Sequence, residues 1–146
     1  MISENDFGNH NEKQQQEQQF FEVGKVEEVP DGKMKYVEIQ GKEIVISNID
    51  GKFYAMDDRC SHTNAPLSMG HIQGNIVTCP MHGARFDITT GKKVSDPKMP
   101  SFNIESLPSN MQKYLEYAGQ LLSRIKTYDQ DTYEVIVEGN SIKLRL

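Results

Sequence analysis

The chain has 146 residues, enough for one domain with a hydrophobic core, and its 36% apolar and 25% charged residues are typical of folded soluble proteins. The net charge of −5 argues against a nucleic-acid-binding protein, which needs a basic face. No apolar run approaches the ~20 residues of a membrane span, and the polar N-terminus lacks the apolar core of a signal peptide. We therefore expect a cytoplasmic protein that binds neither nucleic acid nor membrane.

The N-terminal residues differ in composition from the rest of the chain. Residues 1–19 are polar, rich in Gln and without apolar periodicity, so we expect a disordered tail ahead of a folded domain at 20–146. Short β-rich runs follow, and Asp50-Gly51 is a typical hairpin turn. Closely spaced short strands with such turns predict an antiparallel all-β domain. The first runs span residues 21–29, 34–39, 43–47 and 52–56.

The segment from 57 to 100 has another character. It is rich in Gly, Pro, His, Cys and Met, and its expected strands, at 76–79, 85–88 and 93–94, are very short. Its apolar residues are too sparse to form a core of their own. Such a segment needs a bound metal, or a larger domain beneath it, to hold its shape.

One helix is expected near the C-terminus, over about 109–126. Its apolar residues recur at spacings of three and four, which places them on one face. We expect this face to cover an edge or face of a sheet, and a helix that docks a partner is the alternative. Two strands, at 132–137 and 141–146, close the chain. The apolar face comprises Met111, Tyr114, Leu115, Ala118, Leu122 and Ile125.

The residues that carry chemistry are two Cys–His pairs. Cys60 and His62 form a C-x-H motif, and Cys79 and His82 form a C-x-x-H motif. Sixteen residues separate the two motifs. A Cys₂His₂ set suits either structural Zn²⁺ or a [2Fe–2S] cluster with both Cys on one iron and both His on the other. Structural zinc sites usually pair Cys with Cys and His with His. The mixed pairing here favours a binuclear cluster held between two loops, because each loop must reach both irons.

The runs around these pairs resemble a known family. Residues 60–70 and 79–87, together with Gly91, look like the two cluster loops of Rieske proteins. The likeness is greatest to the soluble ferredoxins that serve bacterial ring-hydroxylating oxygenases. By this resemblance, Cys60 and Cys79 bind the buried iron of one [2Fe–2S] cluster per chain. His62 and His82 bind the outer iron near the surface.

The resemblance implies a fold and a function. The fold is a base of antiparallel sheets packed as a sandwich, plus a small cluster-binding subdomain at about 57–100, with the helix at 109–126 as an insertion. The function is that of a one-electron carrier, which takes electrons from a reductase and passes them to an oxygenase or another acceptor. The chain is not expected to be an enzyme by itself, although it can belong to a multicomponent oxidoreductase.

The resemblance also predicts a low midpoint potential. High-potential Rieske proteins have a Ser and a Tyr whose hydroxyls donate to the cluster sulfur atoms, whereas Ala84 and Phe86 stand at those places here. They also carry an extra Cys in each loop, which this chain lacks. Fewer hydrogen bonds stabilise the reduced cluster less. We expect a potential near the bottom of the Rieske range, around −150 mV or somewhat above.

Two features depart from the ferredoxin pattern. The Gln-rich tail and the helical stretch at 109–126 are both additional, so the donor, the acceptor and the oligomeric state stay open. The alternative functions are a zinc-stabilised binding module and a Rieske fold without metal. The presence of all four ligand residues argues against the second.

Overall fold

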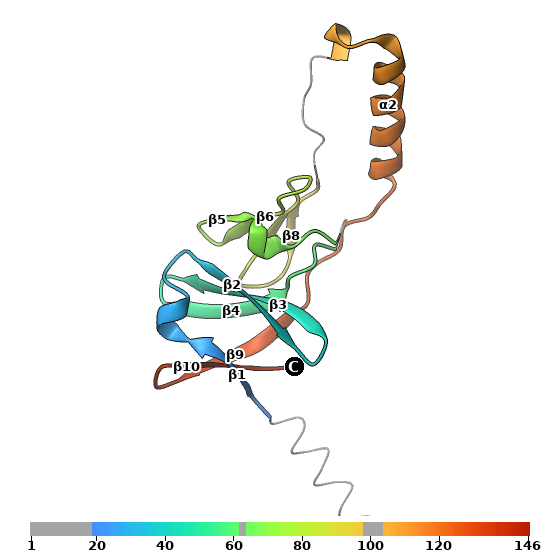
Figure 1. Cartoon of the computed structure of the whole chain (residues 1–146). Coiled ribbons are helices and arrows are strands. Elements are labelled where there is room, and N and C mark those ends of the chain that lie inside the picture. Colours follow the sequence, from blue (N-terminus) through green and yellow to red (C-terminus); the bar gives the residue numbers. More distant parts are fainter. Residues whose placement is uncertain (1–18, 62–63, 98–103) are drawn as a thin grey trace, which may run out of the picture.

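The computed structural model describes residues 19–61, 64–97 and 104–146. These residues form two antiparallel sheets and the helix α2, and Figure 1 shows α2 projecting beyond the smaller sheet. The predicted all-β fold with one inserted helix is confirmed. Of the predicted tail, only Gln19 is among the described residues.

The larger sheet has six strands in the order β1-β10-β9-β4-β3-β2, and every pair is antiparallel. Two of its hairpins turn on residue pairs with positive φ at both positions, Gln40-Gly41 and the predicted Asp50-Gly51. Such turns match the twist of the strands that they join. The strands are β1 (Phe21–Lys25), β2 (Met34–Ile39), β3 (Lys42–Ile49), β4 (Lys52–Asp57), β9 (Thr132–Glu138) and β10 (Ser141–Arg145).

This sheet folds over between β4 and β9, where the paired residues are Ala55 with Tyr133 and Met56 with Thr132. Its two halves enclose one apolar core, to which β3, β4 and β10 contribute buried side chains. The base is therefore a small sandwich, as predicted. The buried members of this base core are Val29, Ile44, Ile46, Ala55, Ile142 and Leu144.

The smaller sheet has four strands in the order β5-β6-β7-β8. It packs through Val77 and Phe86 against the second face of β3, which contributes Val45 and Ile49. Strand β3 is therefore buried on both faces and separates the two cores. The four strands are β5 (His71–Gln73), β6 (Ile76–Thr78), β7 (Arg85–Asp87) and β8 (Lys93–Ser95), and β5 was not predicted.

Three short 3₁₀ turns connect these elements. The first, η1 (Val26–Glu28), replaces the second half of the strand predicted at 21–29, so that prediction is wrong beyond Lys25. The other two are η2 (Leu67–Met69), between the sheets, and η3 (Ile104–Ser106), ahead of the helix.

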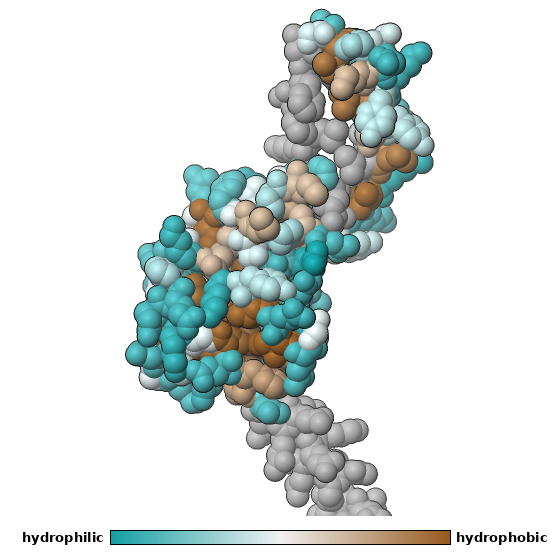
Figure 2. Space-filling view, viewed as in Figure 1, coloured by the Kyte–Doolittle hydropathy of each residue, from teal (hydrophilic) through white to brown (hydrophobic). Residues whose placement is uncertain are grey.

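Helix α2 (Ser109–Ser123) is amphipathic, as predicted, but it ends three residues before the predicted boundary at 126, so Ile125 lies beyond it. Its position also differs from the prediction. Figure 1 shows it standing away from both sheets, and Figure 2 shows apolar residues along the arm that it forms. Met111, Tyr114 and Leu121 are exposed. The expectation that this helix covers a sheet is wrong, because α2 stands clear of both sheets. Across the described part of the chain, no helix is long and apolar enough to span a membrane.

Matched leucines test this arrangement. Leu144 is 0% exposed in the base core and Leu121 is 44% exposed on α2. We predict that Leu144→Ala lowers the free energy of unfolding by about 2–5 kcal/mol through the cavity that it leaves. Leu121→Ala should change it by no more than about 0.5 kcal/mol. Urea denaturation of the two variants measures both, and a large loss in Leu121→Ala would mean that α2 packs on the domain.

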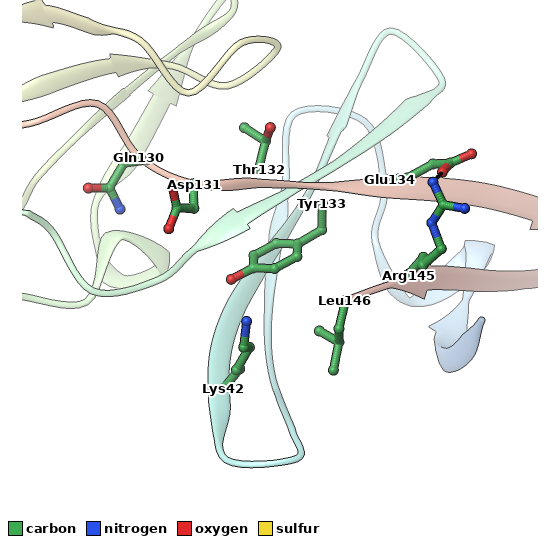
Figure 3. Close-up of a pocket in the computed structure, with 8 residues that line it drawn as sticks. All are labelled: Lys42, Gln130, Asp131, Thr132, Tyr133, Glu134, Arg145 and Leu146. Atoms are coloured by element: carbon green, nitrogen blue, oxygen red, sulfur yellow. Dashed lines mark ion pairs between the residues drawn. The ribbon is translucent and has the colours of Figure 1, made fainter. Parts of the chain in front are cut away.

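Tyr133 joins the two halves of the base. Its hydroxyl donates a hydrogen bond to Oδ1 of Asp57 at the end of β4, and Lys42 Nζ lies 5.4 Å from the centre of its ring. Figure 3 shows Tyr133 and Lys42 in a shallow hollow beside the Arg145–Glu134 ion pair. Burial, and then the hydrogen bond to Asp57, raise the pKa of the Tyr133 hydroxyl well above its ordinary value.

This raised pKa predicts a loss of stability in alkali. The unfolded chain releases the tyrosine proton near pH ~10, whereas the folded chain keeps it. The contribution of this hydroxyl is therefore complete below pH ~10 and declines as the pH rises further. Urea denaturation between about pH 9 and pH 11 should show a steeper decline for the native chain than for Tyr133→Phe. Parallel declines would contradict the assignment.

Candidate metal centre

The two cysteines lie in one buried cluster, although they come from separate loops. Cys60 follows the end of β4 by three residues, and Cys79 follows β6 directly. Both are buried and neither forms a disulfide. They pack with Leu67, Val77 and Phe86, under the smaller sheet and against β3. The fold therefore brings two thiols into one dry environment, where a charged thiolate requires a partner.

The two cysteine loops have the same hydrogen-bond pattern. In the first, Cys60 N–H donates to Ala65 O and Asn64 N–H donates to Cys60 O, each at 2.8 Å. In the second, Cys79 N–H donates to Ala84 O at 2.8 Å and Gly83 N–H donates to Cys79 O at 3.2 Å. The residue four positions after each cysteine, Asn64 or Gly83, has positive φ. Each loop therefore presents its cysteine at an equivalent position.

Positive φ is uncommon in residues other than glycine, but Asn tolerates it better than most. The two cysteine loops therefore reach the same backbone conformation with different residues, Asn64 in the first and Gly83 in the second. Asn64 lies within the motif that carried the resemblance, but its backbone conformation was not predicted.

The structure describes three of the four predicted ligand residues. His82 lies in the second loop, three residues after Cys79, with its Nδ1 shielded from solvent. His62 lies outside the described residues, which end at Ser61 and resume at Asn64. Within the described ranges, no three His, Cys, Asp or Glu side chains meet in a site for a single metal ion.

The residues beside Cys79 agree with the prediction that the site lacks hydroxyl donors there. Ala84 and Phe86 are completely buried, and both belong to the same cluster as the cysteines. Neither side chain can donate a hydrogen bond.

The first loop is held by polar side chains on its outer side. Arg59 pairs with Glu43 of β3 and donates to the carbonyl of Asn64 at 3.0 Å, which ties the loop to the base. The hydrogen bond from Arg59 lowers the pKa of Glu43 below its ordinary value. Asp58 is buried, and its Oδ1 accepts from the backbone N–H of Ser68 at 2.7 Å. These contacts fix the loop around Cys60.

Sequence reasoning missed two further residues at this loop. Ser61 Oγ exchanges hydrogen bonds with the backbone of Tyr128, and its N–H donates to Gln130 Oε1 at 2.9 Å. Gln130 lies seventy residues after Cys60 in the sequence, in a segment without any recognisable motif. No signal in a single sequence could have identified it.

The donors present fit a Rieske cluster. Such a cluster takes four ligands, two Cys and two His. The two buried thiols and the shielded imidazole nitrogen match three of them. The apolar residues around the thiols exclude water from the side where the cysteines lie. A cluster at this position would be held between two loops of matching geometry.

Comparison with known proteins agrees with this geometry. The family model for the Rieske [2Fe–2S] domain matches residues 19–128. The ferredoxin component of the naphthalene 1,2-dioxygenase/salicylate 5-hydroxylase systems of Ralstonia sp. is 35% identical over 80 residues, which cover 55% of this chain and 77% of that protein. The ferredoxin subunit of the 3-phenylpropionate/cinnamic acid dioxygenase of Photorhabdus laumondii is 47% identical over 73 residues, 49% of this chain and 69% of that protein.

The solved structures add the fold. The ferredoxin of carbazole 1,9a-dioxygenase from Nocardioides aromaticivorans IC177 superposes with a TM-score of 0.64 at 21% identity, over 86% of this chain and 95% of that chain. From the family match, the relatives and the two buried thiols together, we conclude that this chain belongs to the Rieske [2Fe–2S] family and is an electron-transfer protein with one such cluster.

Proposed function

We propose that this chain carries single electrons from a reductase to an oxygenase, or to another protein acceptor, in the cytoplasm. Its cluster is held by Cys60, His62, Cys79 and His82. The observation that carries the proposal is the burial of both thiols at equivalent positions of two matched loops. The dioxygenase systems to which the ferredoxin relatives belong are the basis for naming an oxygenase as acceptor.

The thiols and the imidazoles have different roles at the site. When bound, the cluster supplies a one-electron couple, which needs no proton or substrate site from the protein. The buried thiols of Cys60 and Cys79 would hold one side of the cluster away from water. The imidazoles of His62 and His82 would hold the other side, through which an electron would pass to a docked partner.

The surface beside the cysteine loops suits transient protein contact. Met81 lies between Cys79 and His82 and is exposed, and Met69, close after the first loop, is exposed as well. Methionine side chains adapt their shape to different partners. We propose that this methionine-rich surface meets both the donor and the acceptor in turn.

Ligand variants test the proposal directly. Cys60→Ser and Cys79→Ser should each remove the cluster, because a neutral hydroxyl cannot replace a thiolate on a ferric ion. The native chain should contain about two irons and two sulfides and give a rhombic EPR signal after reduction with dithionite. His71→Ala, an exposed histidine outside the motif, is the matched control and should retain both. An EPR-silent native protein with one zinc per chain would refute the proposal.

A second experiment concerns the potential. We predict that Ala84→Ser raises the midpoint potential, because a hydroxyl beside Cys79 can donate to the reduced cluster. Each tenfold gain in preference for the reduced state corresponds to about 59 mV. Ala55→Ser, at a buried position in the base core, is the control and should leave the potential unchanged. Protein-film voltammetry measures both, and a potential above about +100 mV in the native chain would contradict the low-potential assignment.

A further inference from the structure

Gln130 is a buried amide whose hydrogen bonds converge on the first cysteine loop. Its side chain is 6% exposed and lies where the chain enters β9, as Figure 3 shows. Nε2 donates to the carbonyl of Asp57 at 3.0 Å and to that of Arg59 at 2.9 Å. Oε1 accepts from the backbone N–H of Ser61 at 2.9 Å. Both ends of the amide therefore bind the loop.

Two of these bonds hold the peptide groups on either side of Cys60. The carbonyl of Arg59 belongs to the peptide that precedes Cys60, and the N–H of Ser61 belongs to the peptide that follows it. The orientation of these two planes sets φ and ψ of Cys60, and with them the direction of its Cα–Cβ bond. One side chain thus fixes where the Cys60 thiol points.

Cys79 is held in a different way. It follows β6 directly, and Thr78 pairs with His71 on one side and with Arg85 on the other. Pro80 follows it and restricts the next backbone angle. The sheet thus orients Cys79. Cys60 lies beyond the end of β4, where the isolated bridge between Arg59 and Pro66 is the nearest pairing.

The backbone of Gln130 is itself held in place. Its N–H donates to the carbonyl of Gly91 at 2.7 Å. Gly91 has positive φ, and a Cβ there would lie 2.2 Å from the carbonyl oxygen of Gln130. The turn after β7 therefore sets the distance between this residue and the smaller sheet. Gln130 therefore connects the first cysteine loop and the turn at Gly91 to β9, the strand that follows α2.

We propose that Gln130 is a positioning residue for the cluster, which acts by fixing the two peptide groups that flank Cys60. This inference rests on the proposed function, because it takes Cys60 as a ligand. Gln130 lies outside the predicted motif and reaches it through the backbone N–H of Ser61. Its effect should appear in the properties of the bound cluster as well as in the stability of the fold.

Two substitutions separate the roles of the amide. Gln130→Met keeps the length of the side chain and removes all three hydrogen bonds. Gln130→Glu keeps the acceptor for Ser61 N–H but loses both donors, and places a carboxylate against the carbonyls of Asp57 and Arg59. The matched control is Asn48→Leu. Asn48 is also 6% exposed, and its amide bonds the backbone of Val29 and Gly51 in the base, at 2.8 and 2.9 Å.

The measurements use the full chain with its cluster. Both Gln130 variants should lose the cluster to an iron chelator about tenfold faster than the native chain, as expected for the loss of buried hydrogen bonds. Their reduced EPR signals should broaden and their midpoint potentials should shift, because Cys60 samples more than one orientation. Asn48→Leu should unfold at lower urea concentration but keep the native EPR signal, potential and rate of cluster loss.

The results divide cleanly. If both Gln130 variants lower stability as Asn48→Leu does, with the native EPR signal and potential, the residue is structural only and the proposal is overturned. A failure of both variants to fold also overturns it, because the residue then supports the whole domain. If Gln130→Met alone fails to fold, Gln130→Glu decides by the same measurements. A native chain without a cluster refutes the proposed function instead.

Discussion

Strand β3 is buried on both faces, and the rest of the structure depends on that double burial. Ile44 and Ile46 pack into the base core, while Val45 and Ile49 pack under the smaller sheet. A subdomain with four strands of three residues each has too little apolar surface to fold alone. Instead, its apolar side chains pack against the second face of β3. Two thiols can therefore lie in a dry interior within a short segment of chain.

The two cysteine loops show how similar geometry can rest on different supports. Each loop uses a residue with positive φ four positions after its cysteine and a carbonyl five positions after it. The sheet orients Cys79 through the strand that precedes it. Cys60 is oriented by contacts with distant segments, through the ion pair of its neighbour Arg59 with Glu43 and through the hydrogen bonds of Gln130. An approximate internal symmetry is thus built from unrelated contacts.

Much of this architecture follows from local sequence. Asp50-Gly51 and the alternating runs around it fix hairpins because turn conformation and strand pairing are local properties. The Cys–His spacing predicts the site because the expected ligands come from two short runs. The position of α2 could not be predicted, since an apolar stripe such as that with Met111 and Tyr114 indicates a helix but not what covers it. Gln130 was invisible because its partners are distant in sequence and belong to the backbone.

The arm formed by α2 also affects which proteins can exchange electrons with the cluster. Its C-terminal root lies against the first cysteine loop, where Tyr128 and Ser61 share two hydrogen bonds. A protein that approaches this loop meets the arm as well and must leave room for it. Electron tunnelling slows with distance, so a partner has to fit beside this arm to bring its own redox centre near the first cysteine loop.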